Sequence, residues 1–470
     1  MKPYQKRTRA AAGIALSFVL FCLVSHVAAA TAPNQEIMQA VRNGDQATVS
    51  RLLAAGADCN TPDAIGHNPL RLAVAGGNPA IVEALIAAGA DVNLRYPDET
   101  TILLEAVRGG RHEIVRLLLD HGASPHVADG EGITALMWAV KNGNTAVVEI
   151  LLVKGVDVRA RARNGATALM FVNEKGSGRL VELLSNAGAD LHAMDADGNS
   201  VLMFMAKHGL TEGVKILLAA KAQVNTKNKD GLTPLVCAVL GMHGETVAVL
   251  LENGADPNVT FIGDMTPLIS AARRGDMKSV TALLRHGARI NTTNRGMVTA
   301  LMSAAGEGHH EVVGLLLHHQ QADVAIRNKA GRTALMYAAS HGHTEAARLL
   351  VAGGAEIDAR DSRGVTALAL AASCGLTPTV AMLLDSGADL NLTDSHGSTA
   401  LMFASWAGHE ETVRLLIERG ARVSLTDSSG KSAKTWASEQ GYDRVVRLLQ
   451  DAEARDGAAK AADAVAEQNG

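Results

Sequence analysis

Apolar residues along the chain group into pairs of short helical stripes, and residues 397–427 show the pattern most clearly. The first stripe consists of Leu401, Met402 and Ala404. The second consists of Val413, Leu415, Leu416 and Ile417. Thr399 is placed to cap the first helix, and Gly420 is placed to close the second in the left-handed conformation. Because each helix is too short to be stable alone, the pair must bury its apolar face against another pair.

The same pair recurs through nearly the whole chain. The residue equivalent to Thr399 returns every 33 residues, with one step of 34, at Gln35, Asn68, Thr101, Thr134, Thr167, Ser200, Thr233, Thr266, Thr299, Thr333, Thr366 and Ser432. The closing glycine independently keeps the same period at Gly56, Gly89, Gly122, Gly155, Gly188, Gly254, Gly287, Gly354 and Gly387. The sequence therefore predicts one array of about thirteen stacked units between Asn34 and Gln450.

Thr-Pro-Leu opens two of these units, at 233–235 and 266–268, with proline at the first helical position. With this opening and period, the sequence resembles the ankyrin-repeat family. The resemblance implies an all-α solenoid of helix-turn-helix units with short hairpin connections. It also implies a non-enzymatic scaffold that binds other proteins.

One departure from the family pattern is systematic. Methionine replaces the usual histidine at Met137, Met170, Met203, Met302, Met336 and Met402. The replacement exchanges a side-chain hydrogen bond for apolar packing. This form is similar to exported bacterial ankyrin-repeat proteins.

Residues 1–30 lie outside the repeat and predict a secretory signal peptide. A basic start is followed by the apolar run Ala10–Val24 and by the small residues Ala28–Ala30. We therefore expect a periplasmic protein, with secretion as an effector that binds a host protein as the alternative. An uncleaved anchor is disfavoured because the apolar run falls short of the ~20 residues that a membrane span needs.

Charge and cysteine content restrict the function classes. The net charge is −4, and loss of the four basic residues in 1–30 would leave 40 basic against 48 acidic residues, a net of −8. An acidic chain disfavours nucleic acid as a partner. Cys59, Cys237 and Cys374 fall in distant units, so no internal disulfide is expected. We expect a monomer without cofactors.

The ends and three units depart from the regular pattern. We expect residues 31–452 to form the array and 453–470 to be a disordered or frayed tail, because the latter segment has no apolar stripe. Units five and six carry bulkier residues, Val172 and Met205, and Lys221 replaces the closing glycine. Unit nine adds one residue within 318–321. We expect local bends or soft points here, with neutral drift in tolerant turns as the alternative.

Cations recur at the end of the first helix of many units, where ankyrin proteins present their binding surface. They are Arg42, Arg108, Lys141, Lys175, Lys207, Arg273 and Arg274. We expect this row to receive a protein partner with an acidic surface. The alternative is that these are solvated cations, which helix C-termini favour in any case.

Aromatic and histidine residues complete the candidates. Trp406 and His341 occupy the row of helix ends in later units, and Tyr96 and Phe261 in hairpins are weaker candidates, with local packing as the alternative. No catalytic motif occurs, and the histidines lack metal-site spacing. A metal-binding or thiol-active protein that uses Cys374 and the histidines of units nine to eleven remains the rival from another class.

Overall fold

The computed structural model describes residues 35–63, 65–97, 99–174, 177–319 and 322–468. Within these ranges the chain forms helices and isolated β-bridges, without an extended strand. Its helices follow the predicted repeat in pairs, which confirms the all-α repeat fold. The predicted signal peptide, 1–30, lies outside the described residues.

The chain divides into two compact parts, each made of several repeats. These two parts are called the first unit and the second unit, and the repeats are counted separately. The first runs to Val201 and includes Ala219–Ala222, and the second comprises Leu202–Leu218 and the chain from Gln223 onward. The boundary falls in the part of the chain where the repeat pattern weakens.

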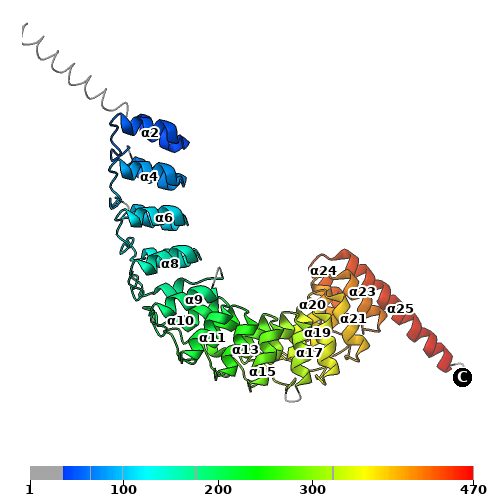
Figure 1. The fold of residues 1–470 in the computed structure, drawn as a ribbon. Coiled ribbons are helices and arrows are strands. Elements are labelled where there is room, and N and C mark those ends of the chain that lie inside the picture. The colour runs from blue at the N-terminus through cyan, green and yellow to red at the C-terminus, as the bar shows by residue number, and fades with distance from the viewer. Residues whose placement is uncertain (1–34, 64, 98, 175–176, 320–321, 469–470) are drawn as a thin grey trace, which may run out of the picture. The chain divides into compact units, whose positions relative to one another are not determined.

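In the first unit, short first helices alternate with second helices that lie side by side (Figure 1). The first helices are residues 35–43, α3 (Pro69–Gly76), α5 (Ile102–Arg108), α7 (Ala135–Lys141) and the 3₁₀ helix η1 (Ala168–Phe171). The second helices are α2 (Gln46–Ala54), α4 (Pro79–Ala87), α6 (His112–Asp120), α8 (Thr145–Val153) and α9 (Ser177–Asn186).

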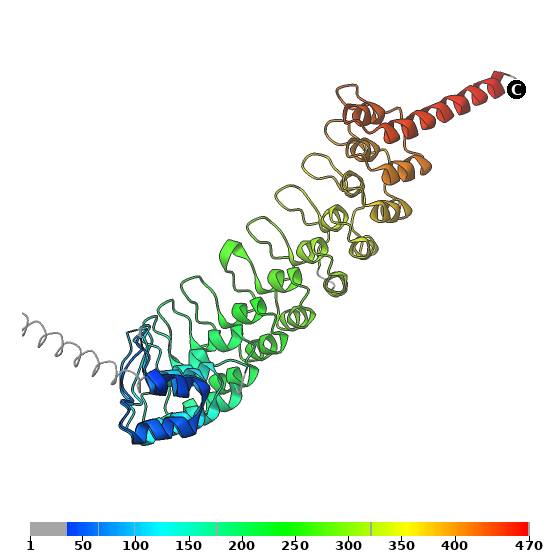
Figure 2. The ribbon, with the colours of Figure 1, turned by 90° about the horizontal axis from the view of Figure 1, so that it is seen from above.

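The second unit repeats the same alternation, and its hairpins project side by side (Figure 2). The first helices are α10 (Val201–Lys207), α12 (Pro234–Leu240), α14 (Pro267–Arg273), α16 (Ala300–Gly306), α18 (Ala334–Ser340), α20 (Ala367–Ser373), α22 (Ala400–Trp406) and α24 (Ala433–Glu439). The second helices are α11 (Thr211–Ala219), α13 (Gly244–Glu252), α15 (Met277–Arg285), α17 (His310–His318), α19 (Thr344–Ala352), α21 (Thr377–Asp385), α23 (Glu410–Glu418) and α25 (Asp443–Gln468). A 3₁₀ turn, η2 (Ile262–Asp264), lies in one hairpin.

The capping and closing residues act as the sequence predicts. Thr399 accepts a hydrogen bond from the backbone N–H of Met402 at 3.3 Å, and Gly420 has a φ of +90°. Leu401 and Leu416 are 2% and 0% exposed. Each pair therefore buries one face completely and depends on its neighbours to do so.

The substituted methionines are buried, as expected, but two also make a polar contact. The sulfurs of Met137 and Met402 accept the N–H of Thr134 and Thr399, each at 3.5 Å. The expected exchange of hydrogen bonding for packing is thus incomplete in these repeats.

Asparagines at the start of the hairpins join consecutive repeats through two hydrogen bonds. The amide of Asn258 donates to the carbonyl of Gly287 at 3.1 Å, and its Oδ1 accepts the N–H of Arg289 at 2.8 Å. Asn60, Asn93 and Asn225 make the same pair of bonds to their following repeats. The recurring asparagine is therefore part of the stacking interface.

Three departures from the repeat have a structural counterpart. In the fifth repeat the first helix is reduced to the 3₁₀ turn η1, and the side chain of Thr167 makes no capping hydrogen bond. In the ninth repeat, α17 has the regular length, but its C-cap residue His319 has an extended backbone, with φ −78° and ψ 101°. The expected tail behaves differently from the prediction: α25 continues as a helix through Gln468, because alanine, glutamate and lysine favour helix even without an apolar stripe.

Among the described residues Cys59, Cys237 and Cys374 are free, the first two buried and the third exposed. In the part of the chain that the structure describes, none of the helices combines the length and apolarity needed to cross a membrane.

Lys221 has the left-handed backbone conformation of the glycine that it replaces, with a φ of +63°. This conformation is unfavourable by about 1–2 kcal/mol for a residue with a side chain, and glycine avoids that cost. Glycine in turn lowers the stability by about 0.5–1 kcal/mol, because its unfolded state has more conformational entropy. Lys221→Gly should therefore raise the free energy of unfolding by about 0.5–1 kcal/mol, measured as a higher urea midpoint. Ala220→Gly, at a neighbouring residue without positive φ, should not; equal effects of the two changes would refute the explanation.

Candidate functional site

An aspartate or asparagine closes the hairpin five residues before most of the helix caps. In the regular repeats these residues, which we call the hairpin column, are Asp63, Asp129, Asp195, Asn228, Asn294, Asn328, Asp361, Asp394 and Asp427. The Oδ1 of each accepts the backbone N–H groups two and four residues later; for Asn294 these are Gly296 at 2.9 Å and Val298 at 3.0 Å. Aspartate and asparagine satisfy this turn equally well, so the turn leaves the charge of the column free to vary.

In the first unit, carboxylates of the hairpin column pair with cations of the predicted row. Arg42 lies 2.8 Å from Asp63, and Arg108 lies 2.6 Å from Asp129. Burial raises the pKa of Asp129, but hydrogen bonds from Trp138, from two backbone N–H groups and from Arg108 outweigh it and hold the pKa below its ordinary value. These two arginines are therefore held within the chain.

Lys141 has a different environment because the residue 21 positions further, Ala162, carries no carboxylate. Its ammonium lies 4.6 Å from the centroid of the Trp138 ring, which also faces Arg108 at 4.5 Å. The structure thus brings Arg108 and Lys141 together on one aromatic ring. Lys175 lies outside the described residues.

In the second unit the first residues of the hairpin column are asparagines. The column therefore offers no carboxylate to pair with the neighbouring cations of the row. Asn228 and Asn294 stand 21 residues after Lys207 and Arg273, where Asp129 stands relative to Arg108. Arg273 pairs instead with Glu307 at 3.4 Å, with both side chains at least half exposed. An exposed pair of this kind contributes at most about 1 kcal/mol.

Lys207 and Arg274 complete the row in the second unit. Among the described residues, neither side chain makes a hydrogen bond or an ion pair that holds it in place, and Arg274 is exposed. The available positive charge of the row is therefore concentrated in this unit.

A hollow of about 260 Å³ opens beside Arg273. Its lining residues are Met265, Arg273, Asn294, Val298, Met302, Ser303, Gly306, Glu307, Tyr337 and His341. The hollow is open because Ser303 and Gly306 have small side chains. At the position of Ser303, α18 carries Tyr337 and α22 carries Phe403. Two predicted site residues, Arg273 and His341, thus line one cavity.

The aromatic candidates separate into exposed and buried residues. Trp406, the last residue of α22, is 53% exposed, as its position in the row implies. Tyr96 is only 4% exposed; its hydroxyl donates to Asn68 at 3.0 Å and its ring faces Arg71 at 4.2 Å. The expectation of Tyr96 as a binding residue is therefore wrong, and local packing explains it. Phe261 is half-buried.

The recurring histidines join repeats. The Nε2 atoms of His243, His309, His343 and His409 lie 3.0–3.1 Å from first-helix carbonyl oxygens of the preceding repeat. Their rings pack against glycines with positive φ; a Cβ on Gly308 would lie 2.5 Å from the His343 ring. The described residues contain no group of three or more histidine, cysteine or acidic side chains arranged to hold a metal ion.

The cysteines differ in exposure. Burial raises the pKa of Cys237 to about 11, which keeps the thiol protonated at neutral pH. Cys374 is exposed, with Ser373 Oγ at 3.7 Å from its sulfur. Within the described residues no basic side chain donates to or accepts from this thiol, and the geometry does not support the thiol-active alternative.

Sequence reasoning missed the hairpin column, although its signal is visible in the sequence. An aspartate or asparagine precedes most caps by five residues, at the same 33-residue period as the caps themselves. Only the structure shows that this residue lies within reach of the cation 21 positions earlier.

A family model described as "Ankyrin repeats (3 copies)" matches the chain in overlapping segments that together span most of its length. The matched residues are 37–129, 122–195, 169–261, 262–328, 320–394 and 380–459. No curated protein matches the chain.

The histidines that join repeats predict different effects of two neighbouring substitutions. His343→Ala should lower the free energy of unfolding by about 1–2 kcal/mol, because it removes the bond to Gly306 and the packing on Gly308. His341 stacks on His343 with centroids 6.1 Å apart but bonds only within its own helix, so His341→Ala should cost under about 0.5 kcal/mol. Urea unfolding measures both, and equal losses would contradict the assignment.

Acid should weaken the last hairpin in a defined pH window. Hydrogen bonds from Ser429 and Lys431, and from Trp436, lower the pKa of Asp427 to about 2. A depressed carboxyl pKa stabilises the fold above the unfolded value near 3.9, and this contribution is lost as pH falls towards 2. Asp427→Asn keeps the turn oxygen, as at Asn328. The urea midpoint of the wild type should exceed that of the variant at pH 5, and the difference should shrink towards pH 2; a constant difference would contradict the assignment.

Proposed function

Since the chain belongs to the ankyrin-repeat family, we propose that it is a non-enzymatic scaffold that binds a protein partner through the first-helix ends of its second unit. Ankyrin repeats are protein–protein interaction modules, and this chain contains little besides them. The partner surface is acidic, and the scaffold binds it as a monomer.

The distribution of neutralised and available cations carries this proposal. Arg42 and Arg108 are paired with hairpin carboxylates, whereas Lys207 and Arg274 are not, and Arg273 has only an exposed partner. These side chains contribute little to the stacking interface, which asparagines, histidines and apolar residues already make. An exposed tryptophan, Trp406, adds a rigid apolar contact in the same row.

We further propose that residues 1–30 direct export and that the mature protein acts in the periplasm of a bacterium. Their basic, apolar and small-residue order supports this. Secretion as an effector that engages a host protein uses the same surface and is the second candidate. Intact-mass analysis and fractionation of the native protein test both: a chain beginning at Thr31 in the periplasmic fraction is expected, whereas an uncleaved chain in the cytoplasm would refute export.

Charge reversal on the row tests the binding proposal. Arg273→Glu and Trp406→Ala should each weaken capture of the native partner at least tenfold in an affinity pull-down with a quantified complex. Arg285→Glu makes the same charge change on a second helix, α15, where the exposed side chain lies away from the row. It should leave capture unchanged. Equal capture by the row variants and the wild type would refute the proposed surface.

A further inference from the structure

We propose, on the basis of the partner-binding function above, that the hollow beside Tyr337 receives an aromatic side chain from an acidic segment of the partner. The shape and lining of the hollow and the charges of two neighbouring groups of residues support this proposal.

The hollow exists because two residues of α16 are smaller than their counterparts. Ser303 stands where α18 and α22 carry Tyr337 and Phe403. A Cβ added to Gly306 would lie 3.1 Å from Cδ1 of Tyr337, so the tyrosine ring closes over the glycine as one wall. The tyrosine is held in this position by the amide of Asn328, which donates to its hydroxyl at 2.8 Å. The hollow is thus preformed.

The size and lining of the hollow suit one aromatic side chain. Its volume of about 260 Å³ is below the range of about 300–1,000 Å³ that whole small-molecule ligands occupy. Two methionines, Met265 and Met302, and Val298 supply apolar surface, and thioether sulfur makes favourable contacts with aromatic rings. An aromatic anchor also costs little conformational entropy on binding.

The first flank carries more positive than negative charge. Arg273 ends α14 and Arg274 follows it as the C-cap, and the carboxylate of Glu307 lies 3.4 Å from Arg273. The amide of Asn294, at the base of this flank, donates to the sulfur of Met265 at 3.4 Å. Because the hairpin column supplies an amide here, the carboxylate that would neutralise Arg273 is missing.

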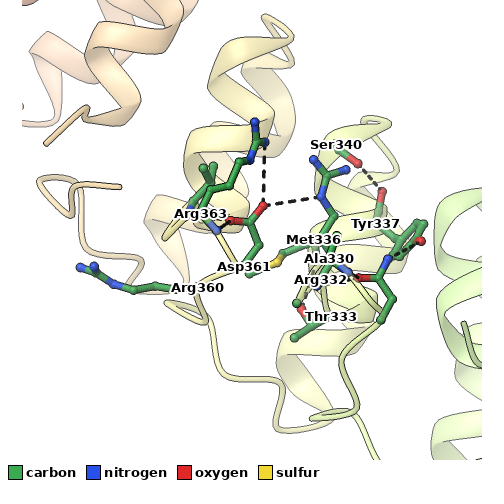
Figure 3. A network of polar contacts seen from close by, with 12 residues as sticks. Ala330, Arg332, Thr333, Met336, Tyr337, Ser340, Arg360, Asp361 and Arg363 are labelled. Carbon is green, nitrogen blue, oxygen red and sulfur yellow. Dashed lines mark hydrogen bonds and ion pairs between the residues drawn. The ribbon is translucent and has the colours of Figure 1, made fainter. Parts of the chain in front are cut away.

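A second group of charges, which we call the second flank, lies in the repeat that carries Tyr337 and in the hairpin that follows it (Figure 3). Arg332 and Arg363 share the buried carboxylate of Asp361, at 3.7 and 3.9 Å. One oxygen of this carboxylate already accepts the backbone N–H groups of Arg363 and Val365. Arg332 replaces the apolar residue that Val298 and Val365 provide in neighbouring repeats, and its Nε is buried without a hydrogen bond. Two guanidinium groups thus face one carboxylate on this side as well.

Together the flanks favour a segment with an aromatic residue between carboxylates. Carboxylates on either side of the aromatic residue would pair with the exposed guanidinium groups of Arg273 and Arg363. A basic segment would meet repulsion from both flanks, and a purely apolar one would leave the arginines without partners.

Synthetic peptides test the inference directly. The probe is fluorescein-labelled Asp-Glu-Glu-Phe-Glu-Glu-Asp, and its matched control carries alanine in place of phenylalanine. Fluorescence anisotropy with the full mature chain should show the phenylalanine peptide binding at least tenfold more tightly than the alanine peptide. A peptide with lysines in place of all the acidic residues should not bind. Equal binding of the phenylalanine and alanine peptides would overturn the aromatic anchor.

Variants of the chain locate the binding site. Ser303→Tyr fills the hollow with the residue that α18 carries at the same position, so it should fold, as circular dichroism and urea unfolding will verify. It should abolish the advantage of the phenylalanine peptide and leave the alanine peptide unaffected. Arg363→Glu should weaken both acidic peptides, whereas Arg285→Glu should weaken neither. An unchanged advantage in Ser303→Tyr would refute the hollow as the site.

The failure of this inference can be told apart from the failure of the proposed function. If Arg273→Glu loses the native partner while Ser303→Tyr retains it fully, the row binds the partner and the anchor hypothesis falls. If Arg273→Glu and Trp406→Ala both retain the partner, the proposed function falls, whatever the peptides show.

Discussion

The structure depends on one constraint: a pair of short helices cannot bury its apolar face alone. Residues such as Leu401 and Leu416 are fully buried only because other repeats cover them. The hydrogen bonds between repeats follow the same rule, since Asn258 spans to Gly287 and Arg289, and His309 reaches the carbonyl of Arg273. These residues recur because each repeat must present the same surface to the next. Departures from the pattern are therefore the positions that the fold leaves free for other uses.

The hairpin column shows how a structural requirement and a binding surface share one residue. The turn needs only a side-chain oxygen, which aspartate and asparagine both supply. The second polar atom of that residue then determines whether the neighbouring cation of the row is neutralised. Asp129 pairs with Arg108, whereas Asn294 carries no charge and Arg273 pairs only with the exposed Glu307. In this protein the charge of the row depends as much on the residues that close the hairpins as on the cations themselves.

The sequence predicted the repeat and its caps because local rules govern them. Thr399, Gly420 and the buried leucines follow from propensity and period alone, and the exposure of Trp406 follows from its register. The pairing of Arg108 with Asp129 could not be predicted in this way, because it depends on where the next hairpin places a side chain. The expectation that Tyr96 is a binding residue was wrong for the same reason, because its hydroxyl donates a hydrogen bond to Asn68 in the preceding repeat. Helix propensity also outweighed the missing apolar stripe in the last turns of α25.

The central claim is that an amide in the hairpin column keeps Arg273 available to an acidic partner. The most direct test is the affinity of the acidic phenylalanine peptide for Asn294→Asp, measured by anisotropy. The variant keeps the turn oxygen, and aspartate already occupies this position in other repeats. We predict that its carboxylate captures Arg273, as Asp129 captures Arg108, and that the affinity falls about tenfold. An affinity equal to that of the wild type would contradict the account.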